Sequence, residues 1–394
     1  MITKLVFNNF YSFLEEQELS FEIGKKPSSS YYDVILESGN RVNKVTAVVG
    51  ANGAGKTQLL RPFAFLSAFA SGSAFDTKPD DPIPFRPHSL SSNETSSFEL
   101  HFTLKEQPFK YLVTMNQKAV VTEALYKKTS RNFSYVFIRE AEGEGYSFKQ
   151  KNFGFPAQQA KKVRSNVSII SAAFQQNVLN SEPLYEFFNE FVFNINIRGR
   201  NHFHDMDILE VANYLESNDS IRTQVHRAVA DFDLGIHDIE YRPHTISNEN
   251  GEEVTFPFPY AIHKCDDGEF SLPLFEESSG TKALFVMLRR VIPVLQQGGI
   301  AILDEIDNDL HPHMLPVILG WFKHKETNPH NAQLIFTCHT PEVLNMLKKH
   351  QVYLVEKSSL KSEAWRLDEM EGIRADDNLY AKYQAGAFGA VPNV

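Results

Sequence analysis

A glycine-rich run that ends in lysine and threonine lies near the start of the chain, at residues 50–57 (GANGAGKT). Its spacing matches G-x-x-x-x-G-K-[ST], a pattern in which glycines let backbone N–H groups curl around phosphate oxygens. In such a loop Lys56 reaches the β- and γ-phosphates, and the Thr57 hydroxyl binds Mg²⁺. The loop residues expected to contact the nucleotide are Asn52, Gly53, Gly55, Lys56 and Thr57. The pattern therefore predicts a site for ATP and Mg²⁺.

Two carboxylates end a second apolar run, at residues 299–305 (GIAILDE). Because the carboxyl ends of strands face the ligand crevice in open α/β sheets, we expect Asp304 to hold the Mg²⁺ shell. We expect Glu305 to orient or deprotonate the attacking water, since phosphoryl transfer depends on positioning and charge stabilisation. A buried strand capped by acidic residues is the alternative, and a nearby phosphate-binding loop weakens it. His339 ends another apolar run (AQLIFTCH), and we expect it beside the γ-phosphate as a second catalytic residue.

The elements that must position these residues show strand and helix patterns in turn. The run VNKVTAVVG (42–50) suits a buried parallel strand, and TQLLRPFAFLSAFASG after it has a helical pattern. Residues 98–148 alternate apolar and polar side chains, which predicts an antiparallel meander. Past residue 270 the chain alternates strand and helix again, in the runs GIAILDE, HMLPVILGWFKH, AQLIFTCH, PEVLNMLKKH and QVYLVEK. The predicted fold is an α/β P-loop NTPase with an antiparallel β subdomain.

Between these two parts the pattern becomes helical, in PLYEFFNEFVFNI, MDILEVANYLE and SIRTQVHRAVADFDLGI. We predict an N-terminal ATPase part at 1–155, an inserted mainly helical domain at 156–270, and a C-terminal ATPase part at 271–394. Four aromatic residues recur at helical spacing in the insert, and we predict that most of these rings are core. They are Phe187, Phe188, Phe191 and Phe193.

Composition and charge bound the class of protein. With 42% hydrophobic residues, the 394-residue chain is expected to be globular with a sizeable core. No apolar run approaches the roughly 20 residues of a membrane-spanning helix, and the first residues (MITKLVFNNF) do not resemble a secretion signal. Only two cysteines occur, Cys265 and Cys338, which argues against a disulfide framework. We therefore expect a cytoplasmic protein without membrane contact.

The net charge of −10 does not favour a nucleic-acid-binding surface, which is usually basic. We interpret the basic clusters as solvated surface charge. These clusters are Lys127–Lys128–Arg131, Lys161–Lys162–Arg164 and Arg198–Arg200. A nucleic-acid groove stays an open alternative that the charge does not support.

Together, the phosphate loop, the paired carboxylates and His339 resemble the ABC-type ATPases, in the branch that includes RecF, SMC and the overcoming-lysogenization-defect proteins. Residues 277–282 (ESSGTK) resemble the ABC signature in a degenerate form, residues 309–312 (DLHP) resemble the D-loop, and His339 resembles the H-loop histidine. This resemblance implies that Ser279 and Gly280 contact the γ-phosphate held by another subunit and that Asp309 belongs to the nucleotide site. It therefore implies a head-to-tail homodimer that closes over two molecules of ATP.

The glutamine that ABC-type ATPases carry in their Q-loop is less obvious in this chain. Gln175 and Gln176 (SAAFQQN) are the candidates, with Gln175 assigned to the nucleotide site and glutamines at the edge of the core as the alternative. Two histidine pairs lack cysteine or carboxylate at ligand spacing, so metal binding is not favoured for them. The pairs are His202 with His204 and His311 with His313.

The opening NNFYSF and the closing residues 384–392 (QAGAFGAVP) resemble the ATPases of PARIS-type and Rlo-type (AbiL-type) anti-phage systems. This resemblance implies a sensor or scaffold ATPase that controls a separately encoded effector protein. A RecF- or SMC-like DNA-repair ATPase that binds duplex DNA is the alternative. A self-contained nuclease is disfavoured, because only about 55 residues follow His339, too few for a fused domain of ordinary size.

Overall fold

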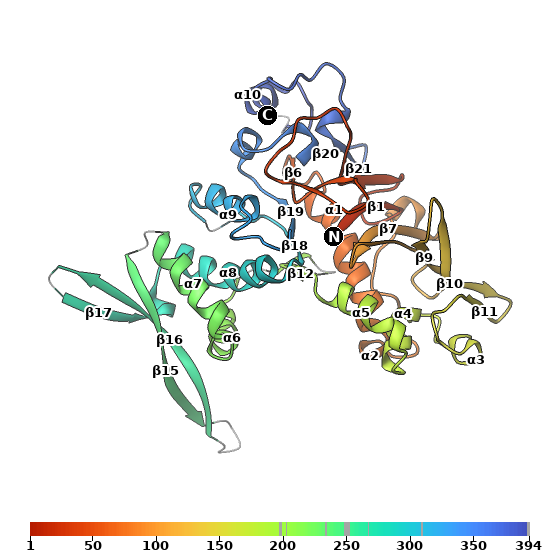
Figure 1. Ribbon diagram of the computed structural model, residues 1–394, viewed down its shortest axis with the longest axis horizontal. Coiled ribbons are helices and arrows are strands. Elements are labelled where there is room, and N and C mark those ends of the chain that lie inside the picture. The colour runs from red at the N-terminus through yellow and green to blue at the C-terminus, as the bar shows by residue number, and fades with distance from the viewer. Residues whose placement is uncertain are drawn as a thin grey trace. The chain divides into compact units, whose positions relative to one another are not determined.

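The computed structural model describes residues 1–196, 199–201, 203–232, 235–247, 253–266, 268–308 and 310–391. The chain forms two compact units, each built from segments that are far apart in sequence (Figure 1). Unit 1 comprises Met1–Arg200, Gly299–Glu305 and Gln333–Val394, and unit 2 comprises Asn201–Gly298 and Ile306–Ala332. The chain therefore passes from unit 1 into unit 2 twice, after Arg200 and after Glu305.

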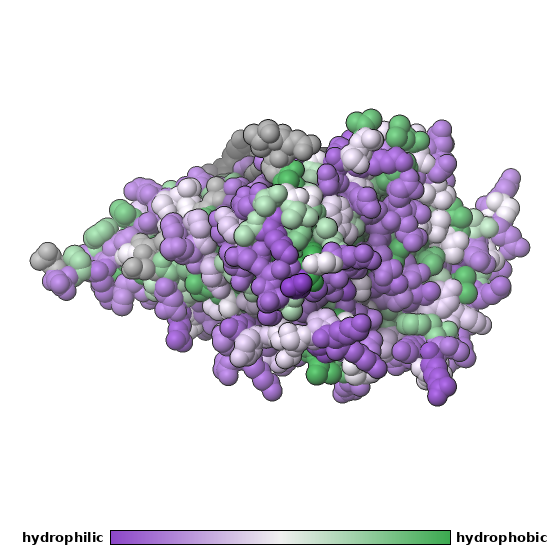
Figure 2. Space-filling view, turned by 90° about the horizontal axis from the view of Figure 1, so that it is seen from above, coloured by the Kyte–Doolittle hydropathy of each residue, from purple (hydrophilic) through white to green (hydrophobic). Residues whose placement is uncertain are grey.

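Hydrophilic residues predominate on the face of the molecule shown in Figure 2, where the hydrophobic residues form small groups. Large apolar side chains that are exposed lie at scattered positions, such as Ile35, Leu179, Met206 and Leu360. Within the described ranges, no helix combines the length and the apolar character needed to cross a membrane.

A six-stranded sheet forms the core of unit 1, in the order β12-β18-β19-β6-β20-β21. Neighbouring strands pair in parallel except β21, which is antiparallel to β20. The strands are β6 (Val45–Gly50), β12 (Val192–Phe193), β18 (Ile300–Leu303), β19 (Gln333–Thr337), β20 (Val352–Ser358) and β21 (Lys361–Arg366). Every residue of β18 and β19 is buried, which explains why these strands are continuous apolar runs in the sequence. The predicted parallel sheet is confirmed.

The helix predicted after the glycine-rich loop is α1 (Lys56–Ser67), which buries Leu59, Leu60 and Phe63. It continues as a π-helical turn, η1 (Ala68–Gly72), and then as α2 (Ser73–Asp76). Because α1 begins at the C-terminal end of β6, its N-terminus faces the edge where the parallel strands end.

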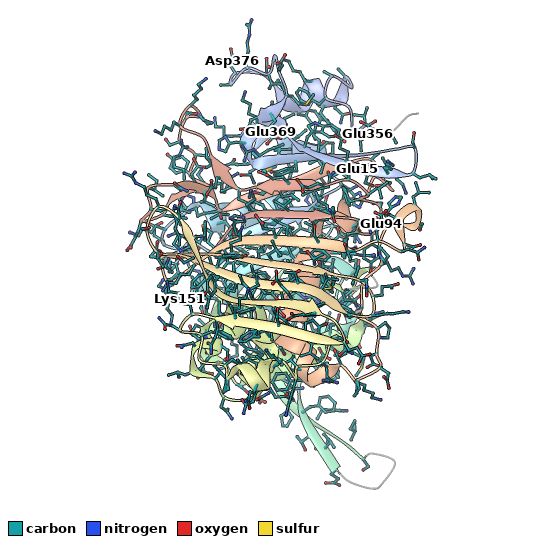
Figure 3. All side chains as sticks on the ribbon, turned by 90° about the vertical axis from the view of Figure 1, so that its right-hand side faces the viewer. Glu15, Glu94, Lys151, Glu356, Glu369 and Asp376 are labelled. Atoms are coloured by element: carbon teal, nitrogen blue, oxygen red, sulfur yellow. The ribbon has the colours of Figure 1, made fainter. Side chains whose placement is uncertain are left out.

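A seven-stranded antiparallel sheet forms the second layer of strands in unit 1, in the order β11-β10-β9-β8-β7-β1-β2. Its strands are β1 (Ile2–Asn8), β2 (Gln17–Ser20), β7 (Ser96–Leu104), β8 (Gln107–Met115), β9 (Val120–Lys128), β10 (Phe133–Glu142) and β11 (Gly145–Gln150). Figure 3 views these strands side by side, with Lys151 labelled just after β11 and Glu94 just before β7. The meander predicted for residues 98–148 is confirmed as β7 to β11.

Residues 156–200, which we expected to open the inserted domain, pack in unit 1 instead. This segment contains α3 (Ala157–Ala160), α4 (Ile169–Gln175) and α5 (Glu182–Asn189). The ring of Phe187 stacks on that of Phe102 in β7 at 4.2 Å, which holds α5 against the antiparallel sheet. Phe187, Phe188 and Phe191 are buried, in agreement with their predicted place in the core.

The helix predicted across residues 183–195 is wrong at its end. It stops at Asn189, and Val192–Phe193 instead form β12, which pairs with β18. Helical spacing of the aromatic residues continues past the helix, so the periodicity alone does not reveal this short edge strand.

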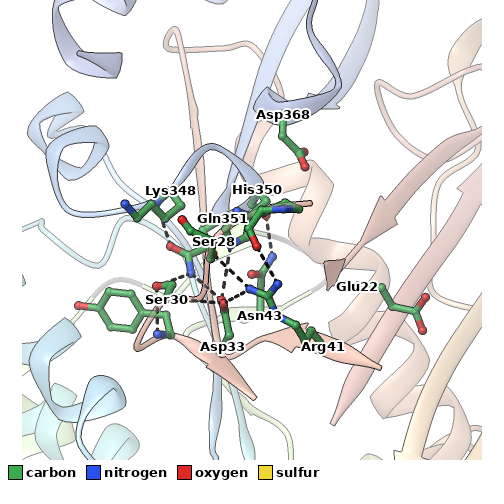
Figure 4. Close-up of polar contacts among 12 residues, drawn as sticks. Glu22, Ser28, Ser30, Asp33, Arg41, Asn43, Lys348, His350, Gln351 and Asp368 are labelled. Carbon is green, nitrogen blue, oxygen red and sulfur yellow. Dashed lines mark hydrogen bonds and ion pairs between the residues drawn. The ribbon is translucent and has the colours of Figure 1, made fainter. Parts of the chain in front are cut away.

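A small sheet near the N-terminus contains β3 (Glu22–Ile23), β5 (Arg41–Asn43) and β4 (Asp33–Ile35), and a polar cluster joins it to η6 (Lys349–Gln351). Asp33 accepts hydrogen bonds from Arg41 at 2.7 Å and Gln351 at 3.2 Å (Figure 4). Burial raises the pKa of Asp33, but His350, whose Nε2 lies 3.5 Å from Oδ1, and the hydrogen bond from Arg41 outweigh it and hold that pKa below its ordinary value. The cluster ties the first part of the chain to its C-terminal part.

Unit 2 contains helices and a three-stranded antiparallel sheet. The helices are α6 (Asp205–Glu216), α7 (Asp219–Asp231), α8 (Ser279–Gln297) and α9 (Met314–Lys323), and the strands are β15 (Ile236–Ser247), β16 (Glu253–Cys265) and β17 (Gly268–Pro273). Helix α8 packs against α6 and α7. Gly298 follows its last residue, and a φ of 79° and closeness to His330 leave no room there for a side chain.

The helix predicted for residues 341–350 (PEVLNMLKKH) is also wrong. The segment forms two short 3-10 turns, η5 (Pro341–Asn345) and η6, that lead into β20. The chain then reaches β21, the short turn η7 (Leu367–Glu369) and α10 (Leu379–Gln384).

Candidate nucleotide site

The glycine-rich loop lies between β6 and α1, and its backbone requires glycine. Gly53 and Gly55 have φ values of 78° and 115°. A Cβ added to Gly55 would lie 2.6 Å from the Ser362 hydroxyl, whereas a Cβ added to Gly53 would meet nothing within 4 Å. Ser362 supports the loop by donating a hydrogen bond to the carbonyl of Ala54 at 2.6 Å. The loop is therefore held from one side, and at Gly53 it is open on the other.

Lys56 and Thr57, the first two residues of α1, are both engaged by polar partners. The Lys56 Nζ donates to the carbonyl oxygens of Gly50 at 2.8 Å and Ala51 at 3.3 Å. The Thr57 Oγ1 donates to Asp304 Oδ2 at 2.7 Å, although the two residues are 247 positions apart. The predicted partners Thr57 and Asp304 are thus in direct contact.

Asp304 follows β18 and is almost fully buried, with 1% of its surface exposed. Its second oxygen, Oδ1, accepts a hydrogen bond from Thr337 Oγ1 at 2.6 Å. A buried carboxylate next to a threonine hydroxyl is the hard oxygen donor set that Mg²⁺ prefers. With the open glycine loop beside them, these residues fit Mg²⁺ and a nucleoside triphosphate.

Glu305 has an unusual backbone and a restrained side chain. Its φ is 48°, in the left-handed region, which costs a non-glycine residue of order 1–2 kcal/mol. Its N–H donates to Thr337 Oγ1 at 2.7 Å, which holds this conformation. Its carboxylate lies 3.0 Å from His339 Nε2 through Oε1 and accepts from Arg200 Nη1 at 2.7 Å through Oε2.

The surroundings of Glu305 favour its ionised form. Partial burial raises the pKa of its carboxyl, but the hydrogen bond from His339 and the charge of Arg200 outweigh burial. The pKa of Glu305 is therefore held below its ordinary value. The carboxylate stays 28% exposed, so a water molecule is able to reach it.

Three residues at this edge were not predicted from the sequence. Asn194, just after β12, forms two hydrogen bonds of 2.7 Å with the backbone of Asp304. Its Nδ2 donates to the Asp304 carbonyl, and its Oδ1 accepts from the Asp304 N–H. Thr337 joins Asp304 to Glu305, and Arg200 binds the Glu305 carboxylate. Thr337 lies two residues before His339 on the same strand end, a signal that the sequence does contain. Asn194 and Arg200 carry no comparable signal.

Two expectations about single residues differ from what is observed. Gln175 ends α4, and its Nε2 donates to the carbonyl of Ala74, so the structure does not bring it to the strand ends that carry the other site residues. Arg200 was interpreted as solvated charge, but its side chain is only 12% exposed and is paired with Glu305. Arg198 lies outside the described residues.

The signature-like residues lie in unit 2, at the start of α8. Ser279 is exposed and Gly280 is partly exposed. Ser278 is the residue that caps the helix, since its Oγ accepts from the N–H of Thr281 at 3.1 Å. Ser279 is therefore not the residue that caps the N-terminus of this 19-residue helix.

Some positions considered in the sequence lie outside the described residues. Asp309 and His202 belong to the positions that are not described. The rings of His311 and His313 lie 5.0 Å apart. Within the described part of the chain, no group of three His, Cys, Asp or Glu side chains is arranged to hold a metal ion.

Solved structures that resemble this chain are heads of SMC proteins. The SMC head domain from Thermotoga maritima shares 14% identity with a TM-score of 0.42 and covers 93% of this chain and 98% of its own. An SMC head bound to the C-winged helix domain of ScpA shares 12% identity with a TM-score of 0.47, covering 94% and 99%. An SMC head domain from Pyrococcus furiosus with an extended coiled coil, bound to the C-terminal domain of ScpA, shares 14% identity with a TM-score of 0.41, covering 93% and 97%.

No curated protein matches the sequence. One protein family matches residues 45–345, and its description reads "AAA domain, putative AbiEii toxin, Type IV TA system". The match spans the glycine-rich loop, both carboxylates and His339, and more than half of the chain. Its parallel sheet, with the glycine-rich loop between β6 and α1, has the fold of a P-loop ATPase, and the chain belongs to this family of AAA domains.

Proposed function

We propose that the protein binds ATP with Mg²⁺ and hydrolyses the bond to the γ-phosphate. The observation that supports this most is the connected set of contacts from Thr57 through Asp304 and Thr337 to Glu305 and His339. These residues come from α1 and from the ends of β18 and β19. They carry the hydroxyl, carboxylate and imidazole groups that metal-assisted phosphoryl transfer uses.

Each side chain has a distinct role in this proposal. Lys56 exchanges its bonds to Gly50 and Ala51 for the β- and γ-phosphate oxygens, and the loop amides around Asn52, Gly53 and Gly55 bind the same oxygens. Thr57 and Asp304 hold Mg²⁺, which supplies positive charge against the phosphates when it is bound.

Glu305 and His339 act on the attacking water. Glu305 orients it and accepts its proton. The lowered pKa keeps the carboxylate ionised, and its partial exposure lets water reach it. His339 holds the Glu305 carboxylate through Oε1, whereas Arg200 binds Oε2.

We further propose that Ser279 and Gly280 complete the site of a second subunit in a head-to-tail dimer. Both residues lie at the N-terminus of a long helix, where the helix dipole and unsatisfied N–H groups favour an anion. Exposure of Ser279 allows the contact with a phosphate that the partner holds. Asp309 belongs to the same proposed interface.

Mixing two inactive variants tests both the site and the dimer. Lys56→Ala removes the phosphate contact within a subunit, and Ser279→Arg blocks the contact to the partner, so neither variant alone has an intact site. A mixed dimer has one intact site, and ATP turnover is expected to return to as much as about a quarter of the wild-type value, half of the dimers being mixed in an equal mixture. Folded variants that never complement at any ratio would reject the head-to-tail arrangement. Unchanged nucleotide affinity of Lys56→Ala would reject the site.

For the cellular role we propose a sensor or scaffold ATPase of a bacterial anti-phage defence system that controls a separate effector. The resemblance of both chain ends to such ATPases supports this, and the family description contains the words "putative AbiEii toxin, Type IV TA system". We expect the isolated protein to hydrolyse ATP slowly and to leave DNA and RNA intact. Co-purification with the product of the adjacent gene, with and without ATP, tests the role. Nuclease activity that tracks with this chain's own carboxylates would refute it.

A further inference from the structure

The ion pair between Arg200 and Glu305 joins the two points at which the chain leaves unit 1. The residues are 105 positions apart, and Arg200 Nη1 donates to Glu305 Oε2 at 2.7 Å. Arg200 is the last residue of unit 1 before Asn201 opens unit 2, and Glu305 is the last before Ile306 re-enters it. Each of the two residues is therefore joined to unit 2 by a single peptide bond.

A short and well-supported path of backbone brings Arg200 to this position. After β12, Asn194 fixes the chain to the backbone of Asp304, and β13 (Ile195–Asn196) then pairs with β14 (Gly199–Arg200). Gly199 has a φ of 136° and donates its N–H to Asn196 Oδ1 at 3.1 Å. The hairpin thus returns to the strand end that carries Glu305.

The geometry at the carboxylate opposes its use as a base in the resting protein. Oε2 accepts a charge-assisted hydrogen bond from Arg200, and Oε1 lies at hydrogen-bond distance from His339. The backbone of Glu305 is also fixed, in the left-handed region, by Thr337. A water molecule that is to donate its proton to Oε2 must compete with a guanidinium group that is only 12% exposed.

We propose that Arg200 is a positioning residue that restrains Glu305 in the resting protein, and that movement of the chain at 200–201 and 305–306 releases the carboxylate for water. This proposal rests on the ATP-hydrolysing function proposed above. Release leaves Oε2 free to accept the water proton while His339 still orients Oε1. The ion pair would thereby link the unit that carries Ser279 to the base that acts on ATP.

Steady-state kinetics of Arg200→Ala test the restraint. We expect kcat for ATP to rise by about threefold or more, a small part of what positioned proton transfer contributes, while KM stays unchanged. Arg200→Lys keeps the charge but not the planar fork, so we expect it to lie between the wild type and Arg200→Ala. In a Glu305→Gln background, Arg200→Ala is expected to change nothing. Arg41→Ala, which removes an ion pair of the same 2.7 Å length at Asp33, is the matched control and should not raise kcat.

Amide hydrogen exchange of the nucleotide-free protein supplies a readout that does not depend on turnover. If the ion pair holds together the two points at which the chain leaves unit 1, Arg200→Ala and Glu305→Gln should each speed amide exchange around residues 199–201 and 305–306. The double variant should then exchange no faster than either single variant. A kcat of Arg200→Ala at or below that of the wild type, or exchange that neither variant changes, would overturn the restraint. Absence of ATP turnover in the wild type would instead reject the proposed function, and the exchange experiment would still decide on the ion pair.

Discussion

Two glutamate–arginine pairs in unit 1 have opposite surroundings. Glu123 and Arg139 lie in the antiparallel sheet with no exposed side-chain surface, and the closest approach of their charged atoms is 3.8 Å. Glu123 accepts hydrogen bonds from Tyr111 and Ser168 at 2.8 Å and from the N–H of Ile169 at 2.9 Å. Arg139 donates to three carbonyl oxygens at 2.8 Å, those of Val163, Arg164 and Val167. Protein groups thus bind both charges, and of the Arg139 nitrogens only the buried Nε lacks a hydrogen-bond partner.

Glu305 and Arg200 form the closer pair, at 2.7 Å, but their surroundings are less complete. The pair lies at the end of a strand, the carboxylate is partly exposed, and the backbone of Glu305 is in the left-handed region. Strain and exposure at a strand end are typical of a residue that acts on a ligand, whereas a fully buried network with many hydrogen bonds is typical of one that stabilises the fold.

The pKa values of Glu123 and Glu305 shift in opposite directions because the two carboxyls are buried to different extents. Complete burial raises the pKa of Glu123, although Arg139 and the hydrogen bonds act against it. Burial also raises the pKa of Glu305, but it is only partial there, so His339 and Arg200 prevail and the pKa falls. A charged partner therefore does not decide the protonation of a glutamate unless the extent of burial is known.

Substitution of Glu123 should produce the largest effect, and it acts on stability. Glu123→Gln leaves Arg139 buried without its counter-ion, so we expect the free energy of unfolding to fall by about 3–5 kcal/mol. Urea unfolding measures this loss of stability. A variant that does not fold at all would agree with a large loss. A loss below about 1 kcal/mol, as at an exposed ion pair, would remove the distinction between the two pairs.

Substitution of Glu305 should act on turnover and leave the fold intact. Glu305→Gln keeps the shape of the side chain but cannot accept the proton of water, so we expect kcat to fall by about a hundredfold or more. ATP should still bind, because Lys56, Thr57 and Asp304 remain, and the closed dimer should accumulate. Light scattering with ATP detects the dimer. Unchanged mass and unchanged turnover would contradict the assignment of Glu305.

The smallest expected effect is the dependence of stability on pH. Because the folded-state pKa of Glu305 is lowered, its ionisation stabilises the protein above the ordinary pKa of glutamate, and this contribution is lost as the pH falls through the lowered value. The raised pKa of Glu123 acts in reverse, since its contribution is present at low pH and is lost as the pH rises through the raised value. Urea unfolding across the acidic range measures the free energy of unfolding of the wild type and of each glutamine variant. The difference between wild type and variant should therefore rise with pH for Glu305→Gln and fall with pH for Glu123→Gln. Parallel curves would contradict these directions.

The part of the site that is local in sequence was predictable, because a few adjacent residues carry it. The glycine loop at 50–57 precedes α1 as expected, and the run at 299–305 is a buried strand that delivers Asp304 to Thr57. Continuous apolar runs also identified β6, β18 and β19 as parallel strands. In each case the signal and the structure lie within one element.

The contacts between distant segments were not predictable, because they depend on strand order. Asn194 reaches Asp304 only because the two-residue strand β12 pairs with β18, and the aromatic spacing around it indicated a helix instead. Gln175 looked suitable for the nucleotide site, but it ends a helix that packs elsewhere in unit 1.

By itself, the sequence determined that this protein has a glycine-rich loop before a helix, a strand that ends in two carboxylates and the parallel strands beside it, since each is encoded by neighbouring residues. Only the tertiary structure decided which arginine is paired with which glutamate. Arg139 and Arg200 are ordinary basic residues in the sequence, and their roles follow from burial and from partners found 16 and 105 positions away. The burial of a side chain and its pairing with a distant residue arise only when the folded chain packs. No local sequence pattern therefore predicts them.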